Sequence, residues 1–278
     1  MDDFTVMITG ASSGLGEAFA RALAPRVRRL VLVARREDRL VMLRAELVAA
    51  HANLEEVRIC RADLAAAADR ERLASAECGE IDLLVNNAGL GDYGDVAGAE
   101  WSRLREMIEV NVTAVVRLAH AVVPGMKRRG RGGIINVSSL AGEVFMPDFA
   151  VYAASKAFVT RFSEALRLEV RESGVSVVAV CPGPVRTEFG AVARRGGRTK
   201  KELPLYGLMH VSPERVVAEA VAAFEKNRAK VFPGRLVPLV AIGLGWLPWR
   251  AVRLVFGRRP RRAASADGPA SADGPGID

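Results

Sequence analysis

The chain has 278 residues, 50% of them hydrophobic and 26% charged, so it can bury a large core and is not disordered over most of its length. Its three cysteines and three histidines show no disulfide or metal-ligand spacing, which argues against a metalloenzyme. The net charge of +8 resides in residues 226–266, which carry ten basic residues and no acidic one. The rest is slightly acidic, which argues against a nucleic-acid-binding surface. No signal peptide is expected, so the predicted location is the cytoplasm.

Short apolar runs predict strands at residues 4–9, 30–34, 57–60, 81–85, 133–137 and 175–180, with 230–234 as a seventh. Helical patterns lie between them, from Gly16 to about Leu23 and at 37–50, 65–76, 100–127 and 152–173. This alternation predicts an α/β domain over residues 1–234. Its sheet is expected to be a doubly wound parallel sheet of about seven strands, of the Rossmann type, with helices on both faces.

The first strand runs directly into a glycine-rich loop with Gly10, Gly14 and Gly16. Glycines let a backbone approach a pyrophosphate closely, and the following helix N-terminus offers N–H groups and a partial positive charge. Ser12 and Ser13 add hydroxyl groups. The alternative is an ordinary glycine-rich turn between a strand and a helix. The position of the loop between the first strand and the first helix favours a nucleotide site.

The second strand ends in Arg35 and Arg36, where dinucleotide-binding folds that use NAD(H) have an acidic residue for the ribose 2′-hydroxyl. Two guanidinium groups suit a 2′-phosphate instead, so the sequence predicts a preference for NADP(H) over NAD(H). The alternative is a solvated arginine pair balanced by Glu37 and Asp38.

Tyr152 and Lys156 lie four residues apart near the start of a predicted helix, so both side chains occupy one face. A nearby ammonium lowers the pKa of a tyrosine hydroxyl, which makes the pair a candidate general acid/base for a carbonyl or alcohol. Alone, such a pair is more often a surface contact. Ser139 follows a predicted strand thirteen positions earlier, at the sheet edge where ligands bind.

Taken together, these motifs resemble the short-chain dehydrogenase/reductase family in its single-domain form. The resemblance covers about residues 4–230. Its motifs are Thr9-Gly-Ala-Ser-Ser-Gly-Leu-Gly16, Asp63, Asn86-Asn-Ala-Gly89, Asn111, Ser139, Tyr152-Ala-Ala-Ser-Lys156 and Pro182-Gly-Pro-Val-Arg-Thr187. They occur in the family's order and at its usual spacings, and several motifs together are far more specific than one.

The resemblance implies a catalytic set and a cofactor site. Tyr152 would exchange the proton, Ser139 would orient the substrate oxygen, Lys156 would bind the nicotinamide ribose, and Asn111 would support a proton-relay water. Ser138 is the competing serine, one residue too far from Tyr152. The cofactor contacts would be Gly10, Ser12, Ser13, Gly14, Leu15, Gly16, Arg35, Arg36, Asp63, Leu64, Asn87, Ala88, Gly89, Tyr152, Lys156, Pro182, Gly183, Val185 and Thr187. No metal is expected.

The C-terminal part departs from the family, because its usual closing strand and glycine-rich ending are not found. Residues 235–262 are apolar and basic, and we expect an interfacial membrane anchor, a cap over the substrate cleft or a dimer contact there. Residues 263–278 repeat a short polar motif and are predicted to be disordered. The usual tetramer is therefore in doubt, and a dimer through the helices at 101–127 and 152–172 is an equal alternative.

The leading hypothesis is an NADP(H)-dependent oxidoreductase that transfers a hydride between nicotinamide and the carbonyl or alcohol group of a small hydrophobic substrate. An NAD-linked alcohol dehydrogenase with the same site is the second hypothesis. A membrane-associated binding protein without activity is the third. Substrate contacts are expected from the loops at 90–98, 140–150 and 188–210, the last of which carries five basic residues.

Overall fold

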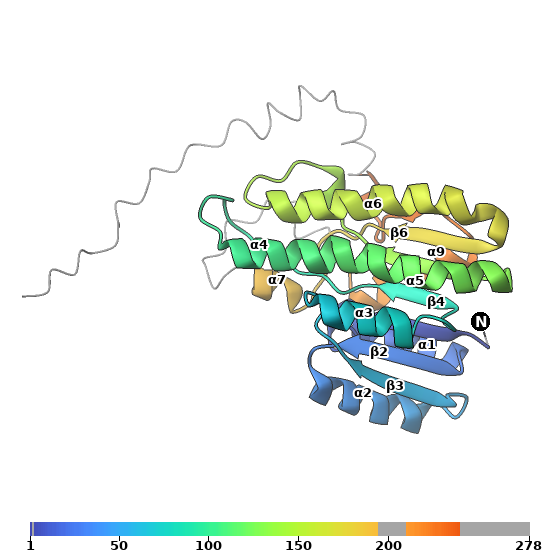
Figure 1. The fold of residues 1–278 in the computed structure, drawn as a ribbon. Helices are drawn as coiled ribbons and strands as arrows, with labels where there is room; N and C mark the ends of the chain where they lie inside the picture. The colour runs from blue at the N-terminus through green and yellow to red at the C-terminus, as the bar shows by residue number, and fades with distance from the viewer. Residues whose placement is uncertain (2, 194–209, 240–278) are drawn as a thin grey trace, which may run out of the picture. The chain divides into compact units, whose positions relative to one another are not determined.

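The structure is a computed structural model, and it describes residues 1, 3–193 and 210–239. In this part of the chain, seven strands form one parallel sheet in the order β3-β2-β1-β4-β5-β6-β7 (Figure 1). The strands are β1 (Thr5–Thr9), β2 (Arg29–Ala34), β3 (Glu56–Arg61), β4 (Leu83–Asn86), β5 (Gly132–Val137), β6 (Val175–Val180) and β7 (Lys230–Val231).

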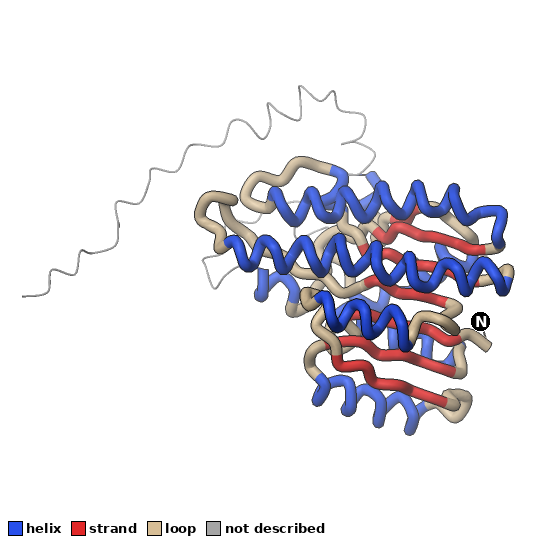
Figure 2. The backbone as a smooth tube through the Cα atoms, in the orientation of Figure 1, coloured by secondary structure: helices blue, strands red, loops and turns tan. Residues whose placement is uncertain are grey.

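Helices cover both faces of this sheet (Figure 2). The α-helices are α1 (Gly14–Leu23), α2 (Glu37–Ala50), α3 (Ala67–Ala76), α4 (Trp101–Ile108), α5 (Ala114–Arg129), α6 (Ala150–Val170), α7 (Phe189–Ala193) and α9 (Pro213–Glu225). Short 3-10 helices span Ala24–Arg26, Leu140–Glu143 and Arg171–Ser173, and a π-helix spans Glu109–Thr113. The arrangement confirms the predicted doubly wound Rossmann-type sheet.

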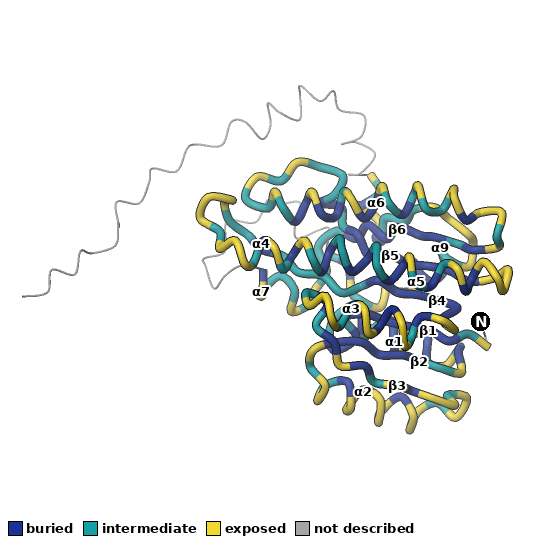
Figure 3. The backbone as a smooth tube through the Cα atoms, in the orientation of Figure 1, coloured by how far each residue is buried: buried dark blue, intermediate teal, exposed yellow. Residues whose placement is uncertain are grey.

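The central strands are buried along their length because helices cover both of their faces (Figure 3). Every residue of β1, β4 and β5 is buried, which explains why these strands read as continuous apolar runs. The edge strand β3 differs, because its Glu56, Arg58 and Arg61 are exposed. An edge strand with charged side chains resists pairing with another chain.

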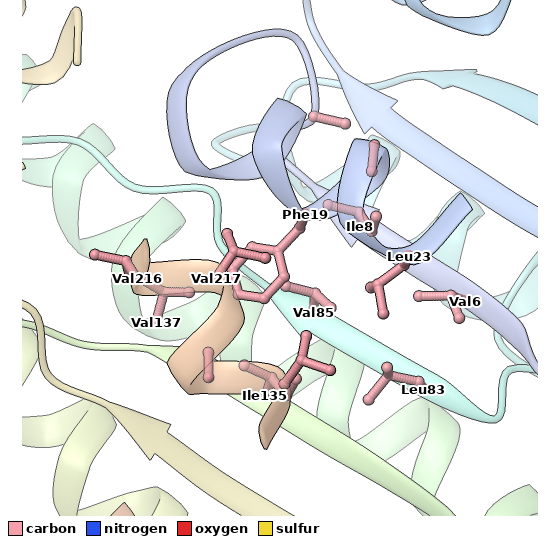
Figure 4. Packing of buried hydrophobic residues seen from close by; sticks show 14 of the residues in the cluster. Val6, Ile8, Phe19, Leu23, Leu83, Val85, Ile135, Val137, Val216 and Val217 are labelled. Carbon is pink, nitrogen blue, oxygen red and sulfur yellow. The ribbon is translucent and has the colours of Figure 1, made fainter. Parts of the chain in front are cut away.

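One face of the sheet packs against α1, α2 and α9. Phe19 of α1 is fully buried there, between the strand residues Val85 and Ile135 and the α9 residues Val216 and Val217 (Figure 4). Fully burying one such side chain contributes about 1.5–3 kcal/mol. Helix α9 was not expected from the sequence, although Ser212 caps it and Pro213 stands at its first position.

The other face packs against α3, α5 and α6. A series of buried polar side chains joined by hydrogen bonds also lies on this face. Asn86 of β4 donates to Asn136 of β5 at 2.9 Å, and Asn136 donates to the Ser163 hydroxyl of α6 at 2.9 Å. Ser163 in turn donates to the Val159 carbonyl oxygen at 2.6 Å. The side chains of Asn86, Asn136 and Ser163 thus each have a hydrogen-bond partner, which avoids the cost of burying them unpaired.

The helix predicted over 100–127 differs from the prediction. It is interrupted by the π-helix Glu109–Thr113, which holds one of the candidate site residues. In α6, Phe158 is exposed, whereas the polar residues Ser155 and Thr160 are buried, so polar groups line part of its inner face.

Residues 101–129 are also long and apolar enough, by composition, to cross a membrane. This stretch contains α4, the π-helix and α5, and α5 forms part of the core on one face of the sheet. A core helix meets the same criterion, so the stretch adds no argument for a membrane. Three predicted segments lie wholly or partly outside the described residues. They are the polar tail at 263–278, residues 240–262 of the apolar and basic segment, and the basic part of the loop at 188–210, which is residues 194–209.

Candidate active site

The loop after β1 is shaped by glycines. Gly10 and Gly14 have φ angles of 67° and 58°, in the left-handed region that favours glycine. A Cβ atom on Gly10 would lie 2.9 Å from the Cα atom of Ala88, in the loop after β4. The loops after β1 and β4 therefore touch at the point where the strand order reverses, which is where ligands bind in open α/β sheets.

The N-terminus of α1 fits an anionic group. Ser13 is its N-cap residue, yet the Ser13 side chain makes no capping hydrogen bond to the helix. The first N–H groups of a helix carry a partial positive charge, so a phosphate there would satisfy them. The glycine loop beside this terminus lets a ligand approach the backbone closely, so the terminus fits the pyrophosphate of a dinucleotide cofactor.

Of the two arginines after β2, only Arg36 lies at the glycine loop. Its guanidinium group donates to the Ser13 hydroxyl at 2.7 Å and to the Ser12 hydroxyl at 3.3 Å. Arg35 instead forms an ion pair with Glu106 of α4, at 2.9 Å. The structure thus brings Arg36, Ser12 and Ser13 together as a candidate phosphate site and places Arg35 elsewhere.

The Asn87 side chain joins the loop after β4 to the glycine loop after β1. Its side-chain amide donates to the Thr9 carbonyl oxygen at 2.9 Å and to the Gly10 carbonyl oxygen at 3.4 Å. The Thr9 hydroxyl in turn accepts hydrogen bonds from the backbone N–H groups of Asn87 and Ala88, both at 3.0 Å. The conformation of the glycine loop is therefore fixed by the segment after β4.

Two of the predicted cofactor contacts, Asp63 and Leu64, follow β3. The Asp63 carboxylate accepts a hydrogen bond from the Ala65 N–H at 3.0 Å, and the Leu64 carbonyl oxygen accepts one from Arg70 at 2.7 Å. Arg70 is buried and also pairs with Glu109, the first residue of the π-helix, at 2.7 Å. Arg70 therefore connects the segment after β3 with the π-helix.

Tyr152 lies in the first turn of α6, where aromatic rings surround it. Its ring stacks on Phe149 with centroids 4.2 Å apart, and the Phe189 ring lies 5.5 Å away. The Tyr152 residue is 7% exposed. Phe149 and Phe189 fall within the ranges 140–150 and 188–210 expected to contact substrate, but the sequence did not single them out, because the spacing of single aromatic residues predicts no contact.

Lys156 is one helical turn from Tyr152 on the same face. Its ammonium lies 5.8 Å from the centroid of the Tyr152 ring and donates to the Val137 carbonyl oxygen at 2.9 Å. Burial lowers the pKa of Lys156 from its ordinary value to about 8, because desolvation disfavours the charged form. An ammonium with such a pKa titrates close to physiological pH.

Asn111 is fully buried in the π-helix, beside the lysine. Its Oδ1 atom accepts a hydrogen bond from the Leu90 N–H at 2.8 Å, and its amide donates to the Ser155 hydroxyl at 3.0 Å. A Cβ atom on Gly89 would lie 3.2 Å from the Lys156 ammonium and 3.5 Å from Asn111 Oδ1. Gly89 therefore lies against both Lys156 and Asn111, and a side chain at this position would crowd them.

The two serines after β5 have different surroundings. Ser138 is 2% exposed, donates to the Lys156 carbonyl oxygen at 2.7 Å and lies 2.7 Å from the Thr160 hydroxyl. Ser139 is half-buried, and its hydroxyl accepts a hydrogen bond from the Ala141 N–H at 3.1 Å. Ser138 is thus engaged inside the fold, and Ser139 is the more accessible candidate.

The segment after β6 completes the site. The Pro182 carbonyl oxygen accepts a hydrogen bond from the Leu140 N–H at 2.8 Å, which ties this segment to the one that holds Ser139. A Cβ atom on Gly14 would lie 3.2 Å from Thr187 Cγ2, so Thr187 flanks the glycine loop. The predicted contacts Gly183 and Val185 lie between these two points of attachment. Among the described residues, no group of acidic, histidine or cysteine side chains has the arrangement of a metal site.

Comparisons with known proteins agree with this geometry. A family model described as short chain dehydrogenase matches residues 4–196. The chain is 37% identical over 221 residues to an NADP-dependent 3-hydroxy acid dehydrogenase from Escherichia coli O6:H1, covering 78% of this chain and 86% of that protein.

Two solved structures are similar over nearly the whole chain. A short-chain dehydrogenase from Sphingobium yanoikuyae, in complex with NADPH, is 32% identical, with a TM-score of 0.76 over 94% of this chain and 98% of that one. A bulky-bulky ketone specific alcohol dehydrogenase from Comamonas testosteroni is 28% identical, with a TM-score of 0.74 over 95% of this chain and 98% of that one.

Proposed function

This chain belongs to the short-chain dehydrogenase/reductase family of NAD(P)-dependent oxidoreductases acting on alcohol and ketone groups, and we propose that it uses NADP(H) to reduce an apolar ketone or aldehyde. The observation that supports this proposal is that Lys156 lies near the Tyr152 ring and, with Asn111, against Gly89 after β4, and donates to Val137 in the strand that leads to Ser139.

The residues around the glycine loop would hold the cofactor. The N-terminus of α1 would bind the pyrophosphate, and Arg36 with Ser13 would bind the 2′-phosphate. When bound, the cofactor supplies or accepts the hydride, and the protein supplies position and electrostatics. The Lys156 ammonium would bind the nicotinamide ribose hydroxyls.

In the reduction, the carbonyl carbon of the substrate gains the hydride and its oxygen gains a proton from the Tyr152 hydroxyl. Ser139 would donate a hydrogen bond to that oxygen and so orient it. The Lys156 ammonium would stabilise the phenolate left on Tyr152, and the tyrosine would regain its proton through a water near Asn111. Oxidation of an alcohol runs through the same groups in reverse.

The apolar surroundings of Tyr152 support an apolar substrate. Tyr152 packs in a cluster with the buried residues Leu104 and Met107, against which Phe149 and Phe189 also pack. Apolar walls beside one proton donor favour a hydrophobic ligand whose single polar group is oriented.

The NADP(H) preference is supported by Arg36, which lies at the glycine loop without an acidic residue of β2 beside it. An acidic residue at the end of β2 would instead favour NAD(H). The similar dehydrogenase from Sphingobium yanoikuyae was solved with NADPH. An NAD-linked alcohol dehydrogenase would show the reverse cofactor preference in the same assay.

We also propose a homodimer in the cytoplasm, a homotetramer being the alternative, and a peripheral membrane contact through residues 236–262. Exposed apolar side chains on the expected dimer helices support the dimer: Trp101 of α4 is 68% exposed and Leu168 of α6 is 68% exposed. The basic and apolar composition of 236–262 supports the membrane contact.

The proposed reaction is tested by following the oxidation of NADPH and NADH with carbonyl compounds of increasing chain length. We expect turnover with NADPH that improves with apolar chain length. Tyr152→Phe should abolish turnover and leave NADPH affinity nearly unchanged, because the substitution removes only the hydroxyl. If Tyr152→Phe retains most of the rate, Tyr152 is not the proton donor. An absence of turnover with every compound, alongside cofactor binding, would favour a binding protein.

A further inference from the structure

A carboxylate outside the predicted set lies at the candidate phosphate site. Glu188 directly follows Thr187, and one of its oxygens lies 3.1 Å from an Nη atom of Arg36. Its other oxygen lies 3.0 Å from an Nη atom of Arg39, one turn further along α2. Hydrogen bonds from Arg39 and Arg36 lower the pKa of Glu188, so its carboxylate is ionised at neutral pH.

The same guanidinium group thus holds Ser13 and Glu188 at once. Carboxylates and phosphates take charge-assisted hydrogen bonds from the same arginine N–H groups. A 2′-phosphate at Arg36 would therefore meet Glu188 as a competitor of like charge. The 2′-hydroxyl of NAD(H) carries no charge and would leave the Arg36–Glu188 pair in place.

We propose that Glu188 is a cofactor-specificity residue that occupies the 2′-phosphate position on Arg36 and is displaced by NADP(H) but not by NAD(H). This inference rests on the proposed NADP(H) site. It assigns Glu188 two effects: the residue weakens NADPH binding, and it makes the segment that follows sensitive to which cofactor is bound.

That following segment, α7, reaches the catalytic tyrosine. The Phe189 ring, next in the chain, lies 5.5 Å from the Tyr152 ring. A Cβ atom on Gly91 would lie 2.7 Å from Phe189, and the Ala193 carbonyl oxygen accepts a hydrogen bond from the Tyr93 N–H at 2.8 Å. Glu188 therefore joins the arginine of the cofactor site to the aromatic wall around Tyr152.

The test measures the affinities of NADPH and NADH by calorimetry for the full chain and for Glu188→Gln, which keeps the side-chain shape. We expect Glu188→Gln to tighten NADPH binding about two- to fivefold, the range for an exposed ion pair, and to leave NADH affinity unchanged. Glu37→Gln is the matched control, because it removes the same charge from the exposed residue directly after Arg36. It should produce a smaller change.

A second variant separates direct competition from a general charge effect. In an Arg36→Gln background, Glu188→Gln should no longer change NADPH affinity, because the shared partner is gone. Hydrogen exchange adds a readout on α7: NADPH and NADH should protect residues 189–193 differently in the wild type and equally in Glu188→Gln.

The outcomes distinguish this inference from the proposed function. If NADPH binds more tightly than NADH and Glu188→Gln behaves like Glu37→Gln, the inference fails and the NADP(H) site stands. If Glu188→Gln weakens only NADH, Glu188 holds the ribose hydroxyl and the inference is overturned. If the wild type binds neither cofactor, both the proposed function and the inference fail.

Discussion

The Lys156 ammonium donates a hydrogen bond to the Val137 carbonyl oxygen, 2.9 Å away at the end of β5. This bond joins α6, which carries Tyr152 and Lys156, to the strand that leads to Ser139. The lysine is 5% exposed, and its pKa falls to about 8 because burial disfavours the ammonium.

The lowered pKa of Lys156 predicts a stability that depends on pH. Between about pH 8 and the ordinary lysine pKa of 10.5, the unfolded chain binds a proton at this residue that the native chain does not. Below that window both states are protonated, and the native state bears the full cost of burying the charge. The contribution of Lys156 to the free energy of unfolding should therefore rise with pH by about 1.4 kcal/mol per unit across the window.

Lys156→Met is the matched variant, since it keeps the apolar stem and removes the charge. Urea unfolding measures the free energy of unfolding of both proteins without cofactor. The difference between the wild type and Lys156→Met should shift in favour of the wild type as the pH rises from 8 to 10.5. Parallel pH profiles would show that the Lys156 pKa is not lowered.

The two serines after β5 should respond differently to alanine. Ser139→Ala should lower turnover strongly and cost less stability than Ser138→Ala, because within the described contacts its half-buried hydroxyl accepts only from the Ala141 N–H of the short 3-10 helix. Ser138→Ala should keep most of the turnover of the folded enzyme. It should lower the free energy of unfolding by about 1–3 kcal/mol, because the buried Lys156 carbonyl and Thr160 hydroxyl lose a hydrogen-bond partner. Thermal unfolding and initial rates measured together distinguish the two; the opposite pattern would move the substrate site to Ser138.

The two arginines after β2 should also differ. Arg36→Ala should weaken NADPH binding by roughly tenfold to a hundredfold, as for the loss of a hydrogen bond to a charged group. Arg35→Ala should change it little, because Arg35 pairs with Glu106 instead. Affinities of NADPH and NADH for both variants check this. Equal losses from the two variants would show that both arginines reach the phosphate.

The basic C-terminal segment predicts binding to anionic vesicles that weakens with salt. Each basic side chain near such a surface contributes about 1 kcal/mol, and salt screens that attraction. A chain ending at Leu239 should not bind, and it keeps Val237, which is fully buried in the core. Co-sedimentation at low and high salt measures the effect. If the full chain ignores vesicles while the truncation abolishes activity or dimerisation, the segment is a cap or a subunit contact.

Local patterns predicted the sheet and the site motifs because apolar runs and glycine turns report on the few residues around them. They did not predict the contacts of Arg36, because its partner Glu188 is 152 positions away in the chain. The interruption of the helix over 100–127 was equally hidden, since five residues are too few to show in sequence that the helical hydrogen bonding changes there. The Phe189 ring near Tyr152 likewise depends on how two distant loops fold together.

The π-helix Glu109–Thr113 has a consequence for how this chain tolerates shortening. A π-turn amounts to one residue inserted into an α-helix, and each helical residue turns the chain by about 100°. Deleting one residue here would restore regular hydrogen bonding and favour a straighter helix. It would also turn Asn111 away from Leu90 and Ser155, which its side chain now joins. Such a deletion variant should lose both turnover and melting temperature, because the buried partners of Asn111 would lose their hydrogen bonds and the buried faces of α4 and α5 would be rotated relative to each other. The irregular turn therefore keeps the site residue and the packing of both helices in register.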